Sequence, residues 1–69
     1  MNVSRYYEAD ARILEATDTW QRIVETDGTR HDVGGIAMAP GANAGDRVRL
    51  KVSIGRTGRK FVLASLATE

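Results

Sequence analysis

The sequence predicts an all-β chain: a small barrel of five short strands, folded as a single domain over residues 1–69. Apolar and polar residues alternate along several segments, which is the period of a half-buried strand. Turns rich in glycine separate these segments, and the chain contains seven glycines. Because an open sheet of this size would expose both of its edges, the prediction is a barrel that is closed or nearly closed.

Length and composition restrict the function. The chain has 69 residues, of which 42% are hydrophobic and 28% charged, and it has no cysteine. Ordering such a chain costs on the order of 100 kcal/mol, so nearly all of its apolar residues must be buried to stabilise the fold. Little is left to build a deep catalytic pocket, and we expect a binding module and not an enzyme. Disulfides, thiolate metal sites and thiol nucleophiles are excluded.

The first expected strand runs from Tyr7 to Ile13, where apolar and charged residues alternate. Leu14 and Ala16 fall on the opposite parity, which predicts a bulge. A helix is the alternative, since alanine and glutamate favour helices and Ser4 could cap one. The strand is preferred because the apolar residues follow a helical stripe only loosely.

Turn residues mark the second and third expected strands. A turn at residues 17–19 precedes a strand from Trp20 to Thr26. Asp27-Gly28 then predicts a hairpin turn of the mirror-image kind, because that turn needs positive φ and glycine supplies it. The partner strand covers Thr29 to Val33 and ends at two glycines. One short helical turn fits near residues 34–38.

The most regular alternation follows a loop rich in glycine, Pro40 to Gly45. Over residues 47–54, Val, Leu and Ile alternate with basic residues and serine, so one face of this strand is buried and the other is mostly basic. A turn at residues 55–58 leads into a last strand at residues 60–66. Residues 67–69 are expected to fray.

The net charge of +1 conceals an asymmetry along the chain. Residues 1–33 carry four arginines and seven acidic residues, a charge of −3. Residues 34–69 carry six basic and two acidic residues, a charge of +4. This division predicts one basic face able to meet phosphate groups.

Two parts of the chain resemble oligonucleotide/oligosaccharide-binding (OB) barrels. Residues 11–28 contain Ala-Arg-Ile-Leu-Glu, Trp-Gln-Arg-Ile-Val-Glu and the Asp-Gly hairpin, and resemble the opening of bacterial translation initiation factor one. Residues 40–66 contain Pro-Gly-Ala, Gly-Asp-Arg-Val-Arg and a closing strand with Phe61. They resemble the end of a TRAM domain, a small RNA-binding barrel attached to RNA-modifying enzymes. Both resemblances imply an OB-like fold and a role in translation or RNA handling.

The candidate nucleic-acid-binding residues are mainly basic. Side chains on one face of a strand repeat at about 6.6–6.8 Å, close to the phosphate repeat of a single strand. Contacts between these basic side chains and phosphates would give an affinity that depends on salt and not on the nucleotide sequence. The alternative is that the basic residues form a solvated face, whose charges prevent other strands from pairing with the sheet. The candidates are Arg22, Arg47, Arg49, Lys51, Arg56, Arg59, Lys60, Tyr7 and Trp20.

The aromatic residues are few. Stacking of bases on exposed rings is worth about 1–3 kcal/mol per base. In a chain this small, however, Trp20 and Phe61 are expected to fill the core in preference to stacking. Tyr6 and Tyr7 lie on opposite faces if their segment is a strand, so one of the two points outward.

No catalytic, metal or cofactor site is indicated. His31 and Asp32 are the only histidine–acid pair, and the sequence shows no nucleophile or oxyanion donor to accompany them. We expect His31 to be a surface residue of a hairpin. One histidine without cysteine does not make a typical zinc site. The glycine pairs lack the lysine and hydroxyl residue of a phosphate-binding loop.

The sequence therefore predicts a module that binds RNA or, less favourably, single-stranded DNA, with the ribosome as a conceivable partner. The alternative is a protein–protein interaction module, such as a small phage or mobile-element protein that docks on a host complex. Its acidic residues would then mimic phosphates; these are Glu8, Asp10, Glu15 and Asp18. Without a long apolar run or a signal segment, we expect a cytoplasmic protein with no membrane partner.

Overall fold

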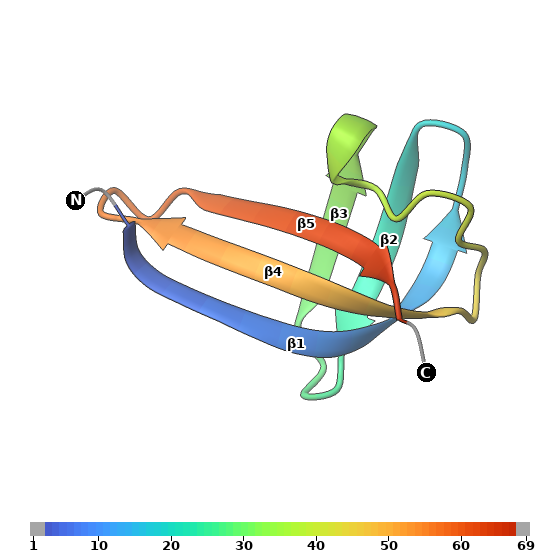
Figure 1. The fold of residues 1–69 in the computed structure, drawn as a ribbon, viewed down its shortest axis with the longest axis horizontal. Helices are drawn as coiled ribbons and strands as arrows, with labels where there is room; N and C mark the ends of the chain where they lie inside the picture. The colour runs from blue at the N-terminus through green and yellow to red at the C-terminus, as the bar shows by residue number, and fades with distance from the viewer. Residues whose placement is uncertain (1–2, 68–69) are drawn as a thin grey trace.

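The computed structural model describes residues 3–67, and these form one antiparallel sheet of five strands (Figure 1). The strand order is β3-β2-β1-β4-β5, and the sheet curls into a half-barrel. The all-β class, the five strands and the short helical turn are confirmed. Within residues 3–67 no helix is long and apolar enough to span a membrane. The elements are β1 (Val3–Ala16), β2 (Trp20–Glu25), β3 (Arg30–Gly34), the 3-10 helix η1 (Gly35–Ala37), β4 (Arg47–Gly55) and β5 (Lys60–Leu66).

β1 is the longest strand, and it is shared by the two halves of the sheet. Residues 3–12 pair with β4, and residues 11–16 pair with β2. The register to β2 shifts between Ile13 and Glu15, which is the bulge that the parity of Leu14 predicts. The strand is therefore confirmed over the helix, and it begins at Val3, earlier than expected.

The β2–β3 and β4–β5 hairpins use the same kind of turn. The Gly28 amide donates to the Glu25 carbonyl at 2.9 Å, and the Glu25 amide donates to the Thr29 carbonyl at 2.8 Å. Gly28 has a φ of 95°, whereas Asp27 does not have a positive φ. The expected mirror-image turn is therefore wrong: a type I turn closed by a glycine bulge needs one positive φ and not two. Gly58, with a φ of 86°, repeats the pattern between β4 and β5.

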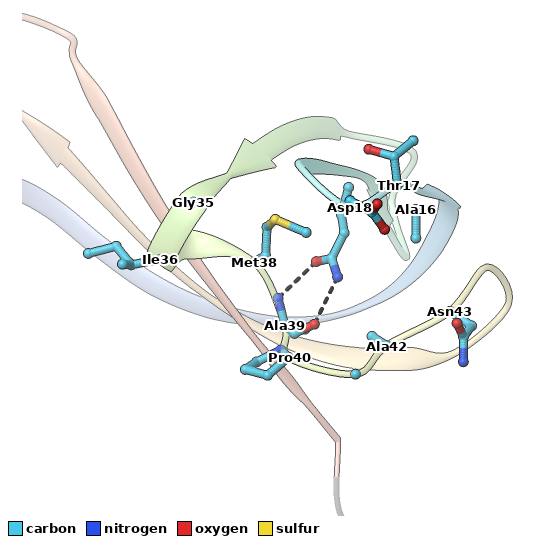
Figure 2. A pocket seen from close by; sticks show the side chains of 12 residues that line it. Ala16, Thr17, Asp18, Gly35, Ile36, Met38, Ala39, Pro40, Ala42 and Asn43 are labelled. Atoms are coloured by element: carbon cyan, nitrogen blue, oxygen red, sulfur yellow. Dashed lines mark hydrogen bonds between the residues drawn. The ribbon is translucent and has the colours of Figure 1, made fainter.

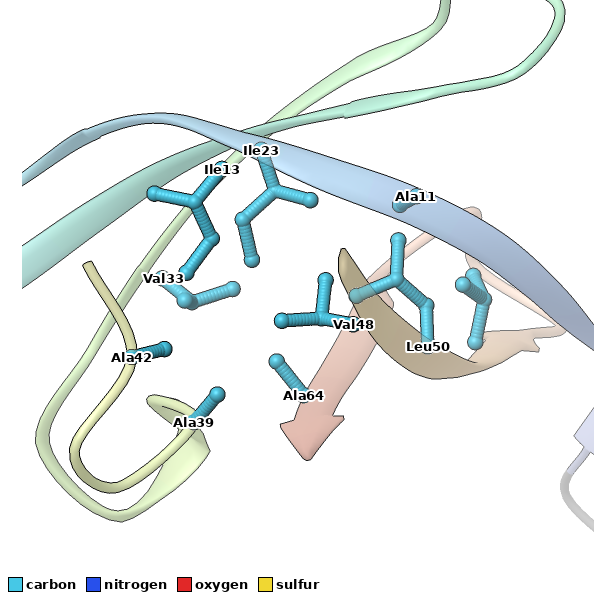
Figure 3. Packing of buried hydrophobic residues seen from close by; sticks show 10 residues of the cluster. Ala11, Ile13, Ile23, Val33, Ala39, Ala42, Val48, Leu50 and Ala64 are labelled. Atoms are coloured by element: carbon cyan, nitrogen blue, oxygen red, sulfur yellow. The ribbon is translucent and has the colours of Figure 1, made fainter. Parts of the chain in front are cut away.

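The core lies between the inner face of the curled sheet and the segment after η1 (Figure 3). The β4 alternation is confirmed, because Val48, Leu50 and Val52 are all fully buried. Small and branched aliphatic side chains fill this core; they are Ala11, Ile13, Ile23, Val33, Ala39, Ala42, Val48, Leu50, Val52 and Ala64.

The expectation that Trp20 and Phe61 fill the core is wrong. Phe61 is 61% exposed, and Trp20 is only half-buried. The register explains the position of Phe61, because it pairs with Ser53 and lies on the face opposite to Val62 and Ala64. Aliphatic residues of the other strands already occupy the inner face.

A buried amide fixes the segment after η1 to the sheet. Gln21 is 2% exposed, and its side chain donates to the Ala39 carbonyl and accepts from the Ala39 amide, both at 2.8 Å (Figure 2). The two bonds replace those that Ala39 would make in a strand. Since an unpaired buried backbone group costs about 1–3 kcal/mol, this pair of bonds positions the loop between β3 and β4.

The chain beyond β5 remains paired at its first residue. The Ala67 amide donates to the Arg47 carbonyl at 3.1 Å, which continues the contact between the two strands. The rest of the segment expected to fray, Thr68 and Glu69, lies outside the described residues.

We expect Gln21→Ala to lower the free energy of unfolding by about 2–4 kcal/mol, because it leaves both polar groups of Ala39 buried without a partner. Denaturant unfolding measures the loss. Asn43→Ala removes an amide that is exposed and should change stability by less than about 0.5 kcal/mol. Equal effects of the two substitutions would contradict the role of Gln21.

Candidate nucleic-acid interface

One end of the sheet carries most of the uncompensated positive charge. We call it the basic end and define it as residues 5–8 of β1 and residues 51–62 of β4, the β4–β5 turn and β5. The only acidic residue in these segments is Glu8, so the five basic residues give a charge of +4. All five are exposed, and none forms an ion pair with another described side chain. They are Arg5, Lys51, Arg56, Arg59 and Lys60.

The strand lengths explain how the basic end arises. β1 pairs with β4 over residues 3–12 but with β2 only over residues 11–16. The first half of β1 therefore extends with β4 and β5 beyond β2, as Figure 1 shows at the end where the β4–β5 turn lies. That turn is held by the Gly55 amide, which donates to the Arg59 carbonyl at 2.9 Å. It presents Arg56 and Arg59 to solvent.

Two exposed aromatic rings lie on the outer face of the basic end. The register places Tyr6 opposite Ser53 and Ser53 opposite Phe61, in one row across β1, β4 and β5. Tyr6 is 55% exposed and Phe61 is 61% exposed. Neither ring was among the candidates drawn from the sequence. Strand alternation at residues 6 and 7 did predict that one tyrosine points outward, and this is confirmed by Tyr6.

Acidic partners neutralise one of the candidate bases, Arg49. Its guanidinium lies 2.8 Å from the Asp10 carboxylate and 3.5 Å from that of Glu8. The hydrogen bond to Asp10 raises the pKa of Arg49. Glu8 also accepts a hydrogen bond from the Tyr6 hydroxyl at 3.0 Å, and this bond, followed by Arg49, lowers the pKa of Glu8. The charge of Arg49 is therefore largely balanced within the sheet.

Arg22 is compensated in the same way. It forms ion pairs with Asp32 at 3.0 Å and Glu15 at 3.2 Å, and the hydrogen bond to Asp32 raises its pKa. Its guanidinium also lies over the Trp20 ring, 5.3 Å from the ring centre. This contact occupies one face of the indole. Arg22 and Trp20 are therefore less available to a ligand than the basic side chains of the basic end.

Tyr7 lies on the inner face, in a buried polar cluster. Its hydroxyl donates to Glu25 at 2.8 Å, and the same carboxylate oxygen lies 2.5 Å from His31 Nε2. Glu25 and His31 are each 7% exposed. The expectation of a surface histidine is therefore wrong, because the alternation of β3 turns His31 inward together with Val33. Tyr7 has a structural role in this cluster.

The structure thus gathers five of the nine candidates at the basic end. Four are exposed cations, Lys51, Arg56, Arg59 and Lys60. The fifth, Tyr7, is turned to the inner face. Arg47 is exposed on the same face of β4 as Lys51 but lies near the other end of the strand. The sequence analysis missed Arg5, Tyr6 and Phe61. The signal for Arg5 and Tyr6 is the pairing of β1 with β4, and the signal for Phe61 is the pairing of β4 with β5. Both depend on register and are not visible in the periodicity of a single segment.

A separate hollow of about 530 Å³ lies at the opposite end of the sheet, between η1, the turn after β1 and the loop after η1 (Figure 2). Small or apolar residues and backbone form most of its wall, including Met38, Pro40 and Ala42. Asp18 is the one ionisable residue among the described residues that line it. None of the described residues that line this hollow is basic, in contrast to the basic end.

The five-stranded half-barrel is compatible with an OB-like small barrel, an architecture that is itself partly open. No protein-family model, curated protein or solved structure matches the chain. The resemblances to initiation factor one and to TRAM domains therefore remain predictions.

We expect the stability of the folded chain to fall in alkali through Tyr7. The hydrogen bond to Glu25, with burial, raises the pKa of Tyr7 above its ordinary value of 10.0. The folded chain therefore holds this proton more tightly than the unfolded chain. Its stabilising contribution is complete below pH 10 and is lost as the pH rises through the raised value.

Denaturant unfolding between pH 8 and pH 12 measures this loss. Tyr7→Phe should lower stability by about 1–2 kcal/mol at pH 8 and should reduce the alkaline decline. Tyr6→Phe is the matched control, and it should change stability less because its hydroxyl bonds to Glu8 at the surface. An unchanged alkaline decline in Tyr7→Phe would contradict this assignment.

Proposed function

We propose that the protein is a non-catalytic nucleic-acid-binding module, and that the basic end binds the phosphates of single-stranded RNA. The observation that supports this most directly is the net charge of +4 at the basic end, where five exposed basic residues form no ion pair with another described side chain. Single-stranded DNA presents the same phosphates and is the second ligand of this class. The proposed setting is translation or RNA handling in the cytoplasm, in accord with the two family resemblances.

The distribution of charge favours a local site over general attraction. Outside the basic end, the described residues carry five basic and seven acidic residues, a charge of −2. Ion pairs such as Arg22 with Asp32 and Arg49 with Asp10 balance much of that charge. A polyanion is therefore attracted to one end and repelled weakly by the rest of the molecule, which orients it on approach.

A protein partner is the second candidate, favoured by the apolar side chains of β5, an edge strand of the sheet. Residues 61–66 carry no charge, and Phe61, Leu63 and Leu66 are 61%, 51% and 41% exposed. Exposed apolar side chains of this kind favour packing against another protein. Mimicry of phosphates by acidic residues is less favoured, because Glu8, Asp10 and Glu15 already bind arginines.

Titration of a uridine 12-mer at several salt concentrations tests the RNA proposal. For single strands, the slope of log affinity against log salt is about −0.7 per phosphate contacted. Four contacts predict a slope of about −3. Arg56→Gln combined with Arg59→Gln removes two exposed bases from the β4–β5 turn, and should reduce the slope in magnitude by about 1.4.

Arg12→Gln combined with Arg22→Gln is the matched control, since it removes the same charge far from the basic end. Its slope should stay near that of the unaltered protein. Equal effects of the two double variants would show a diffuse attraction and not a site. Absence of binding even at low salt would reject the RNA proposal and favour the protein partner.

A further inference from the structure

We propose that Tyr6 and Phe61 form a slot that holds one unpaired nucleobase above Ser53, on the outer face of the basic end. The proposal rests on the proposed RNA-binding function. It adds that the protein contacts a base of the ligand as well as its phosphates. It assigns a base-stacking site to residues that the sequence analysis did not select for that role. The ligand class that follows is single-stranded nucleic acid, with duplexes excluded from the slot.

The register sets the width of the slot. Tyr6 and Phe61 flank Ser53 from the two neighbouring strands, so their backbones are two strand spacings apart, about 9.5 Å. A base stacked between two rings needs about 6.8 Å, which is twice the stacking distance of about 3.4 Å. To hold a base, the two rings therefore have to lean toward each other over the middle strand. Ser53, the residue between them, has one of the smallest side chains.

Exposure fits the same role. More than half of each residue is accessible to solvent, at 55% for Tyr6 and 61% for Phe61. The one hydrogen bond of the Tyr6 hydroxyl to a described side chain is the exposed contact with Glu8 at 3.0 Å along β1, which the ring gives up when it turns toward a base over Ser53. Aromatic side chains have only two rotatable bonds, so little conformational entropy is lost when a base binds.

The charges around the slot select a nucleobase over an apolar peptide. Lys51 lies two residues from Ser53 on the same face of β4, a distance of about 6.8 Å along the strand. Arg56 and Arg59 lie on the other side of Ser53, in the turn that follows β4. A strand whose base enters the slot therefore meets cations on both sides. Glu8, the one acidic residue nearby, is already bound by Tyr6 and Arg49.

Duplex nucleic acid cannot use this slot without first opening. Bases within a duplex are stacked on each other and paired, whereas the bases of a single strand are free to stack on aromatic side chains. A duplex would meet only the cations of the basic end. Preference for single strands is therefore the functional consequence of the two rings.

The test compares two proteins with two ligands, so that the rings and the bases are removed separately. The proteins are the unaltered chain and the double variant Tyr6→Leu/Phe61→Leu. The ligands are a uridine 12-mer and the same backbone without bases. On the uridine strand, loss of both rings should weaken binding at least about fivefold. On the abasic strand the same variant should bind as well as the unaltered protein.

A matched variant guards against unrelated effects. Leu63→Ala removes an exposed apolar side chain of β5 outside the slot and should bind the uridine strand normally. Circular dichroism establishes that each variant is folded. A fivefold loss shared by Leu63→Ala would overturn the assignment to the rings.

The outcomes separate this inference from the function on which it rests. Salt-sensitive binding of both strands that is insensitive to loss of the rings would overturn the slot and leave the phosphate site intact. Equal weakening on the uridine and abasic strands would also overturn it, because the rings would then act without a base. Absence of binding to every strand would overturn both proposals.

Discussion

The ladder between β1 and β4 is the interaction on which the rest of this structure depends. It covers residues 3–12 of β1, whereas the ladder to β2 covers only residues 11–16. This difference in length produces a half-barrel over the core and a three-stranded extension beyond it. The same register aligns Tyr6, Ser53 and Phe61 in one row. A shorter β1 would remove both the extension and the surface we assign to nucleic acid.

Ion pairing limits how two of the ten basic residues, Arg22 and Arg49, can act on a ligand. Arg22 and Arg49 each bind two carboxylates, and these contacts are partly exposed, so their contribution to stability is small. Their more important effect is on the distribution of charge. By compensating the acidic residues of β1 and β3, they leave most of the uncompensated positive charge of the described residues at one end. The asymmetry between the two halves of the sequence thus becomes an asymmetry along the sheet.

The sequence was sufficient to predict the strands and the buried face of β4, because alternation reports directly which residues share a face. It was not sufficient for the aromatic residues or for His31. Phe61 lies in a run of hydrophobic residues, which predicts a buried position. Its exposure depends instead on the pairing of β5 with β4, which places Phe61 on the outer face of the sheet. The sequence predicts a surface position for His31 because it lies in a hairpin, whereas the structure buries it. Its partner Glu25 lies on another strand, and both share the parity of buried Ile23 and Val33 within their strands.

Amide chemical shifts of the labelled protein, followed during titration with a uridine 12-mer at low salt, test the central proposal most directly. Binding at the basic end predicts that the largest shifts fall on residues 5–8 and 51–62, and that residues 35–43 at the opposite end of the sheet do not shift. Shifts centred on η1 and the loop after it, or no shifts at millimolar RNA, would contradict the assignment of the basic end as a nucleic-acid interface.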